Sequence, residues 1–137
     1  YRQIVVGDDA TLSPRHLHLR VDGDAVLAED AGSLNGLYLR LTSPRELADG
    51  DLFVCGDSVF RLCRDRCILD GERMRLFQAP AEPAVQGTVT RILEDGRDGE
   101  VFALRRFPFS FGREEGEARF AADRFMSRRH AEIRFDG

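Results

Sequence analysis

Short runs of alternating apolar and polar residues recur along the chain. Leu17, Leu19 and Val21 alternate with polar side chains, and similar runs occur at 101–105 and 109–111. A period of two residues is typical of a half-buried β-strand. Asp-Gly dipeptides, which supply the positive φ angles of tight turns, punctuate these runs at 22–23, 49–50, 70–71, 95–96, 98–99 and 136–137. No stretch shows a capped 3.6-residue period, so the pattern predicts an all-β sandwich or barrel.

One segment interrupts this pattern. Residues 78–87 contain two prolines and several small residues, and apolar and polar positions do not alternate there. Such a composition is typical of a linker. The sequence therefore predicts a first domain over residues 1–77, a linker over 78–87 and a second domain over 88–137.

An internal repeat links the two predicted domains. Residues 9–23 align with residues 123–137 at an offset of 114, with seven of fifteen positions identical. The two segments are interpreted as copies of one structural unit. On this alignment the first copy lacks its N-terminal strands and the second lacks its C-terminal half. The chain also opens at Tyr1, and we expect it to be part of a longer polypeptide.

Composition narrows the function classes. The chain has 137 residues and a net charge of −4, and its 20 basic residues, all arginine, form no block. This argues against a protein that must neutralise many nucleic-acid phosphates. No apolar run approaches the roughly 18 residues of a membrane helix, and no secretory leader opens the chain. The three cysteines have neither disulfide-framework nor zinc-site spacing, so we expect reduced thiols, no metal and no cofactor.

An ordered set of motifs resembles the forkhead-associated (FHA) family. The second copy shows Ser110-Phe111-Gly112-Arg113 and then Ser127-Arg128-Arg129-His130. The first copy shows Ser13-Pro14-Arg15-His16, Leu27 through Asn35-Gly36, Leu47-Ala48-Asp49-Gly50-Asp51, and Gly56 before Phe60-Arg61-Leu62. The resemblance implies an FHA-type β-sandwich in two incomplete tandem copies, with loops at one end that bind a phosphothreonine peptide.

The resemblance also implies roles for individual residues. An arginine fork at Arg113 matches two phosphate oxygens in charge-assisted hydrogen bonds. Ser127 and Ser13 would donate hydroxyl groups to phosphate, and the Asn35 amide would hold the ligand backbone. The residues assigned to phosphopeptide binding are Arg113, Ser127, Arg128, Ser13, Arg15, Ser33 and Asn35. Those assigned to bracing the loops are Gly112, His130, His16 and Gly36.

Two departures from the family pattern leave an alternative open. Pro14 and Leu34 stand where the family usually places residues that donate hydrogen bonds beside the phosphate. The second copy therefore matches the phosphate-binding part of the family pattern better than the first copy does. The alternative is a degenerate FHA-like module that binds a protein partner independently of phosphorylation. Arg113 could also be an ordinary surface arginine, and Asn35-Gly36 a plain type I′ turn.

Catalysis is not expected from either copy. Ser13 with His16, or Ser127 with His130, lacks the strained nucleophile turn and oxyanion donors of a hydrolase. His16 and His18 lack a third metal ligand.

The sequence thus predicts a non-enzymatic adaptor in the bacterial cytoplasm. Its partner would be a phosphothreonine protein, a Ser/Thr kinase or its substrate, and neither nucleic acid nor membrane. Residues 88–137 of one chain could also pair with 24–64 of another in a swapped homo-oligomer.

Overall fold

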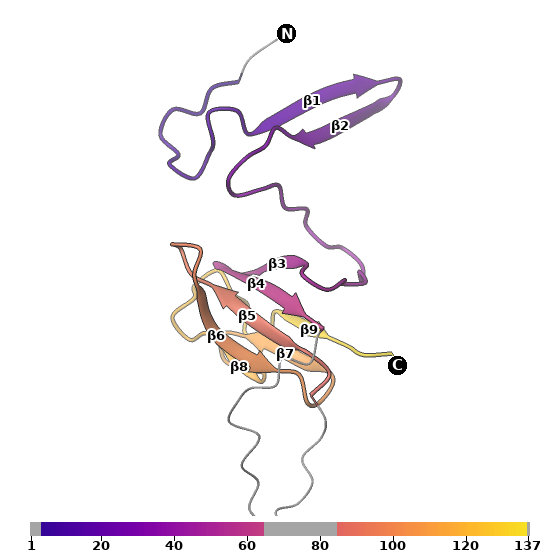
Figure 1. The fold of residues 1–137 in the computed structure, drawn as a ribbon, viewed down its shortest axis with the longest axis vertical. Helices are drawn as coiled ribbons and strands as arrows, with labels where there is room; N and C mark the ends of the chain where they lie inside the picture. Colours follow the sequence, from indigo (N-terminus) through magenta and orange to yellow (C-terminus); the bar gives the residue numbers. More distant parts are fainter. Residues whose placement is uncertain (1–3, 65–84, 137) are drawn as a thin grey trace, which may run out of the picture. The chain divides into compact units, whose positions relative to one another are not determined.

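The computed structural model describes residues 4–64 and 85–136, and all regular structure in them is β (Figure 1). The strands are β1 (Leu17–Asp22), β2 (Ala25–Asp30), β3 (Leu52–Cys55), β4 (Ser58–Cys63), β5 (Thr88–Ile92), β6 (Asp98–Ala103), β7 (Phe109–Gly112), β8 (Ala118–Arg119) and β9 (Ala131–Ile133). The predicted all-β class is confirmed. Across these residues, no helix is long and apolar enough to cross a membrane.

The chain divides into two compact units, Tyr1–Thr42 and Ser43–Gly137. This division differs from the predicted linker at 78–87, of which residues 78–84 lie outside the described residues. It arises because β4 pairs with β5, which joins the strands at 52–63 to those that follow residue 85. The assignment of 1–77 and 88–137 to two repeat copies stays a prediction, because compact units and repeat copies need not coincide.

Among its described residues, 4–42, the first unit contains a single antiparallel hairpin, β1–β2, closed by a turn in which Gly23 has a φ of 59°. The alternation in β1 predicts one buried face. In the structure every residue of both strands is exposed, including Leu19 at 60% and Val21 at 74%. The reason is that residues 4–42 form no second layer on which this two-stranded hairpin could pack.

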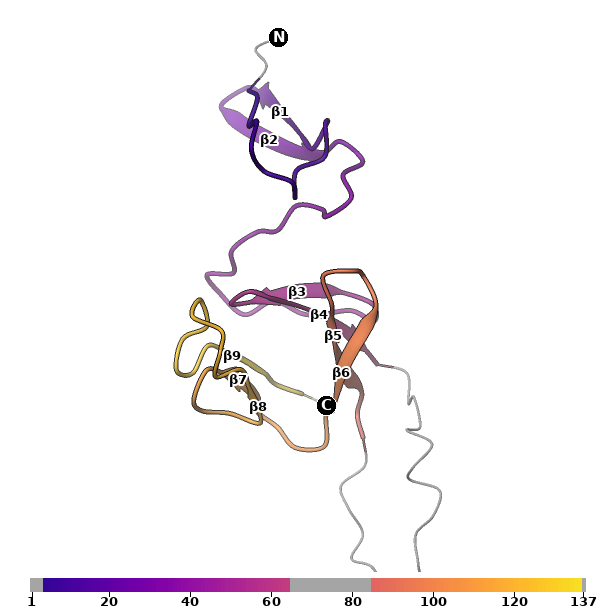
Figure 2. The same ribbon diagram turned by 90° about the vertical axis from the view of Figure 1, so that its left-hand side faces the viewer.

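The second unit is a two-layer sandwich. An antiparallel sheet of order β3-β4-β5-β6 faces a sheet of order β8-β7-β9, as Figure 2 shows. In the smaller sheet β7 pairs parallel with β8 and antiparallel with β9. The buried core between them comprises Cys55, Phe60, Leu62, Val89, Leu104, Phe109, Phe111, Ala118 and Met126.

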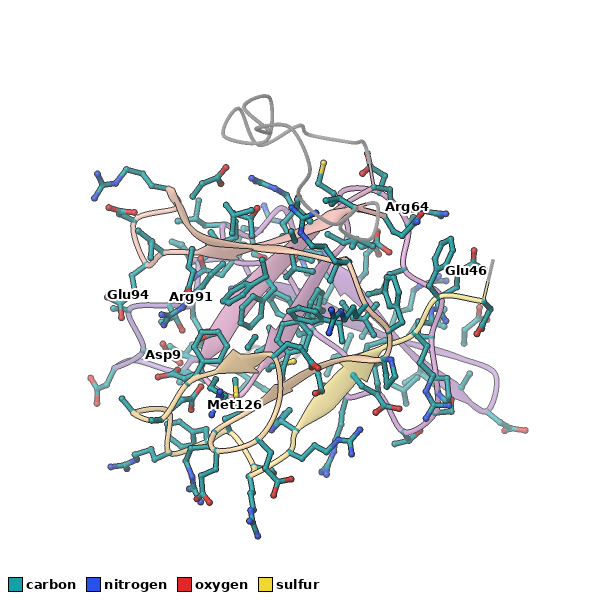
Figure 3. The ribbon with its side chains drawn as sticks, turned by 90° about the horizontal axis from the view of Figure 1, so that it is seen from below. Asp9, Glu46, Arg64, Arg91, Glu94 and Met126 are labelled. Atoms are coloured by element: carbon teal, nitrogen blue, oxygen red, sulfur yellow. The ribbon has the colours of Figure 1, made fainter. Side chains whose placement is uncertain are left out.

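Aromatic contacts tie the two layers together. The Phe111 ring on β7 lies 5.2 Å from Phe60 and 5.7 Å from Phe53, measured between ring centres. The guanidinium carbon of Arg91, which is labelled in Figure 3, lies 5.4 Å from the centre of the Phe120 ring. Such aromatic pairs add to the free energy of burial, so the core fixes how β3–β4 sits on β7.

The predicted Asp-Gly turns are found in part. Gly50 and Gly96 adopt φ values of 83° and 79°, as turns require. The turn prediction for Asp98-Gly99 is wrong, because both residues belong to β6. A Cβ on Gly99 would lie 2.8 Å from the Leu93 side chain, so this glycine allows close packing beside a bulge in β5–β6. The dipeptide at 70–71 and Gly137 lie outside the described residues.

Asp123 fastens the β3–β4 turn to the loop before β9. Its Oδ2 accepts the Asp57 N–H at 2.8 Å, and its Oδ1 accepts Phe125 and Met126 N–H groups at 2.9 and 3.1 Å. Burial alone would raise the pKa of Asp123, but these three N–H donors outweigh it and lower the pKa from 3.8. The carboxylate therefore stabilises the second unit when ionised.

Replacing Asp123 with Asn is expected to lower the free energy of unfolding by about 1–3 kcal/mol at neutral pH, because one acceptor oxygen becomes a donor. The folded-state pKa is depressed, so the unfolded chain binds the proton first as pH falls. The wild-type advantage is complete above pH 3.8 and is lost as pH falls through the folded-state value. Urea unfolding of both proteins at several pH values measures this, with exposed Asp136→Asn as control. A constant difference down to about pH 2 would contradict it.

Candidate functional site

Three of the predicted site residues meet at the end of β7. The Arg113 N–H donates to the Ser127 carbonyl at 2.9 Å, and the Glu115 N–H donates to the Arg128 carbonyl at 3.0 Å. These main-chain bonds hold the Gly-Arg strand end against the loop that precedes β9. Arg113, Ser127 and Arg128 therefore come from two separate segments to one surface.

Gly112 allows this close approach. A Cβ at this position would lie 2.3 Å from the carbonyl oxygens of both Arg128 and Glu115. Any side chain would push apart the two backbone segments that carry the arginines. The glycine before Arg113 is thus required by packing between backbones rather than by a positive φ.

Two carboxylates face these arginines. Arg113 Nη2 lies 3.3 Å from Glu114 Oε1, and Arg128 Nε lies 2.9 Å from Glu115 Oε1 and 3.6 Å from Glu114 Oε2. All four side chains are 39–70% exposed. Exposed ion pairs contribute little, so an incoming phosphate dianion with three acceptor oxygens can replace these carboxylates.

The loop that carries Ser127 is shaped by a histidine. The Ser127 N–H donates to His130 Nδ1 at 3.0 Å, and the His130 N–H donates to the Phe111 carbonyl at 2.8 Å. The Ser127 side chain is exposed. His130 therefore shapes the loop and leaves the serine hydroxyl at the surface.

The first repeat has the same local hydrogen bonds. The Ser13 N–H donates to His16 Nδ1 at 3.0 Å, the distance found for Ser127 and His130. The Thr11 N–H donates to Asp9 Oδ1 at 2.8 Å, as Phe125 N–H does to Asp123 at 2.9 Å. The segments that align at an offset of 114 therefore fold alike locally.

In the first unit the loop before β1 is bonded to the loop after β2. Because His16 Nδ1 accepts a hydrogen bond, its Nε2 carries the proton and donates to the Gly36 carbonyl at 3.1 Å. The Leu34 N–H donates to Ser13 Oγ at 2.9 Å. Asn35 Nδ2 donates to the Thr11 carbonyl at 2.7 Å. Ser13 and Asn35 thus lie side by side.

These hydrogen bonds leave one donor, on Ser13, and one acceptor, on Asn35, that can bind a ligand. Ser13 Oγ acts as the acceptor toward Leu34, so its hydroxyl proton remains a donor. The carboxamide of Asn35 uses its nitrogen, which leaves Oδ1 to accept a peptide N–H. Arg15 is exposed and forms no ion pair with a residue in the described part of the chain.

Ser33 is instead engaged within its own loop. Its Oγ donates to Asp30 Oδ2 at 2.6 Å and accepts the Gly36 N–H at 3.0 Å. The Ser33 side chain, and then its backbone N–H, lower the pKa of Asp30. The φ of 75° at Gly36 closes the loop. The Ser33 hydroxyl thus braces its own loop, and the ligand contact that the family resemblance implies for Ser33 stays a prediction.

The predicted site residues fall in two groups. Ser13, Arg15, His16, Ser33, Asn35 and Gly36 belong to the first unit, and Gly112, Arg113, Ser127, Arg128 and His130 to the second. Sequence reasoning missed Glu114 and Glu115, although an acidic pair directly after Gly-Arg was a visible signal. It also missed the Asp57–Asp123 bond, which no local pattern indicates. The described residues hold no cluster of three metal-ligating side chains.

Comparison with known proteins supports part of this picture. The family model of the FHA domain matches residues 2–56. The match includes Ser13, His16 and Asn35, crosses the boundary between the compact units and ends in the turn after β3. FHA domains are non-enzymatic protein-interaction modules that bind phosphothreonine. Neither a curated protein nor a solved structure matches the chain.

Proposed function

We propose that this protein is a signalling adaptor that binds phosphothreonine peptides through two FHA repeats, the second being the better reader. The observation that carries the proposal is the convergence of Arg113, Ser127 and Arg128 at the end of β7. Two guanidinium groups and a hydroxyl on one exposed surface suit a phosphate dianion. Threonine phosphorylated by a Ser/Thr kinase, on the kinase or on its substrate, is the expected ligand in a bacterial cytoplasm.

The first repeat carries part of such a site on its own loops. Ser13 offers a hydroxyl donor and Asn35 an amide acceptor on bonded loops. Pro14 and the 90% exposed Leu34 add no hydrogen-bonding side chain. We therefore expect Asn35 to hold a ligand backbone in the first repeat, and Arg113 to bind phosphate in the second.

Fluorescence anisotropy with a phosphothreonine peptide library tests this function. Binding should depend on the phosphate, and Arg113→Ala should weaken it by about 10- to 100-fold, because a charge-assisted hydrogen bond contributes roughly 1.5–3 kcal/mol. Glu115→Gln should strengthen binding slightly, since it removes a carboxylate that competes for Arg128. Arg97→Ala is the matched control, because this exposed arginine is paired with Asp95 in the turn between β5 and β6 and is not one of the predicted site residues.

Binding of phosphorylated and unphosphorylated libraries with equal affinity would refute the proposal. The second candidate, a phosphate-independent assembly module, would then be favoured. The specific observation behind that candidate is the exposed apolar face of β1–β2.

A further inference from the structure

A pocket lies on the outer face of the small sheet β8-β7-β9. Phe109 and Phe111 of β7 belong to the core, so Ser110 between them faces the other side of the sheet, where it lines the pocket. The segment 106–108, which precedes β7, also lines it. All the residues around this pocket belong to the second compact unit.

Contacts within the chain fix two walls of the pocket. In the loop before β8, Glu117 Oε2 accepts both the N–H and the hydroxyl of Ser110 at 2.7 Å. Gly116 allows this loop to lie against β7, because a Cβ there would be 2.7 Å from the Ser110 carbonyl oxygen. On another side, the Phe107 ring stacks on Phe135 with 5.5 Å between the ring centres. The shape of the pocket is therefore set before a ligand arrives.

The unpaired charge in the pocket is positive. Arg106 is exposed, and no acidic side chain within residues 4–64 and 85–136 pairs with it. The other charged residues of the lining are bonded within the chain: Glu115 to Arg128, Glu117 to Ser110 and Arg129 to Glu132. A guanidinium with free donors suits a carboxylate, which it can bind through two parallel hydrogen bonds.

The pocket adjoins the surface to which the second repeat is proposed to bind phosphate. Glu115 lines the pocket and also lies 2.9 Å from Arg128 of that surface. Arg129, the next residue along the chain, lines the pocket as well. A peptide whose phosphothreonine lies on Arg113 and Arg128 can therefore place a neighbouring side chain in the pocket.

A strand that followed β9 would leave this pocket open. In the internal repeat β1 is the equivalent of β9, and β2 pairs with β1 edge to edge. One edge of β9 is taken by β7, so a strand in the place of β2 would pair with the other edge and extend the sheet. It would not cover the outer face of β7, so access to the pocket does not depend on what pairs with that edge.

We propose that this pocket binds an acidic side chain of the ligand, and that Arg106 thereby selects phosphothreonine peptides with an aspartate or glutamate close to the phosphothreonine. The selection rests on the proposed function, because the phosphate holds the peptide in place. The methylene groups of the acidic residue would lie against Phe107 and Pro108, and its carboxylate against the Arg106 guanidinium. Arg106 is then a specificity-determining residue that lies outside the Gly-Arg and Ser-x-x-His motifs.

Peptides that differ in a single charge test this selection. Phosphothreonine peptides carry aspartate, asparagine or lysine at one position at a time on either side of the phosphothreonine, and fluorescence anisotropy gives the affinity of each. At one position or more, the aspartate peptide should bind about two- to fivefold more tightly than the asparagine peptide, as expected from an exposed ion pair. Arg106→Gln should abolish this preference and leave the affinity for the asparagine peptide unchanged.

Arg119→Gln is the matched control. It removes the same charge from an exposed arginine on β8 that does not line the pocket, so the preference for aspartate should remain. Arg106→Glu should reverse the preference, so that lysine is favoured over aspartate at the same position. A role for Arg106 in folding alone would not reverse the charge that the protein selects.

The outcomes separate the pocket from the proposed function. Phosphate-dependent binding with no preference for aspartate at any position would overturn the selection by Arg106 and leave the proposed function intact. A preference that survives Arg106→Gln, or that Arg119→Gln removes equally, would overturn it too. Binding without any dependence on the phosphate would refute the proposed function, and the selection would fall with it.

Discussion

Gly112→Ala should lower the free energy of unfolding of the second unit by about 3 kcal/mol or more. The new Cβ would lie 2.3 Å from the Arg128 and Glu115 carbonyl oxygens, and both belong to backbone rather than to flexible side chains. The backbone segments must separate, which breaks the bond from the Glu115 N–H to the Arg128 carbonyl. Urea unfolding monitored by circular dichroism measures the loss.

Gly96→Ala is the matched control for this substitution. Gly96 has a φ of 79° but open space around its Cβ position, so alanine there meets only the left-handed backbone penalty of about 1–2 kcal/mol. If Gly112→Ala cost no more than Gly96→Ala, the close backbone approach at the end of β7 would be wrong. Since the same approach positions Arg113, Gly112→Ala should also weaken phosphopeptide binding, whereas Gly96→Ala should not.

Local patterns predicted the strands better than their partners. Alternation located β1 and the region of β7, and Asp-Gly located the turns at Gly23, Gly50 and Gly96, because these signals depend on neighbouring residues only. Pairing depends on residues far apart in the chain. Nothing local to β4 shows that it pairs with β5 rather than ending a separate domain. The same limit explains why β1 alternates and yet is fully exposed in its unit.

The candidate site shows the same difference between what local patterns predict and what depends on distant residues. The motif Ser-x-x-His predicted the loops, and in both repeats the histidine accepts the serine N–H within three residues. The hydrogen bond from the Ser33 hydroxyl to Asp30 was not predicted, because a hydroxyl can donate equally well to a ligand and to a neighbouring carboxylate. Only the geometry of the loop decides between these two partners.

Phe111→Ala should destabilise the second unit by about 3–5 kcal/mol, the cost of removing a fully buried aromatic side chain. The exposed Phe125→Ala is the control and should change stability by under about 0.5 kcal/mol. Thermal and urea unfolding measure both. A loss below about 1 kcal/mol at Phe111 would mean that the two sheets do not pack through this ring.

A double-mutant cycle between Phe111 and Phe60 turns this prediction into a test of which strands complete the sandwich. The rings are 5.2 Å apart, yet Phe60 lies on β4, before residue 65, and Phe111 on β7, after residue 85. A coupling of about 0.5–1.5 kcal/mol is expected from their contact. Additive losses would mean that β3–β4 packs elsewhere. Coupling would show that the β3–β4 hairpin packs on the aromatic side chains of β7, and Asp123 bonds the turn of the same hairpin.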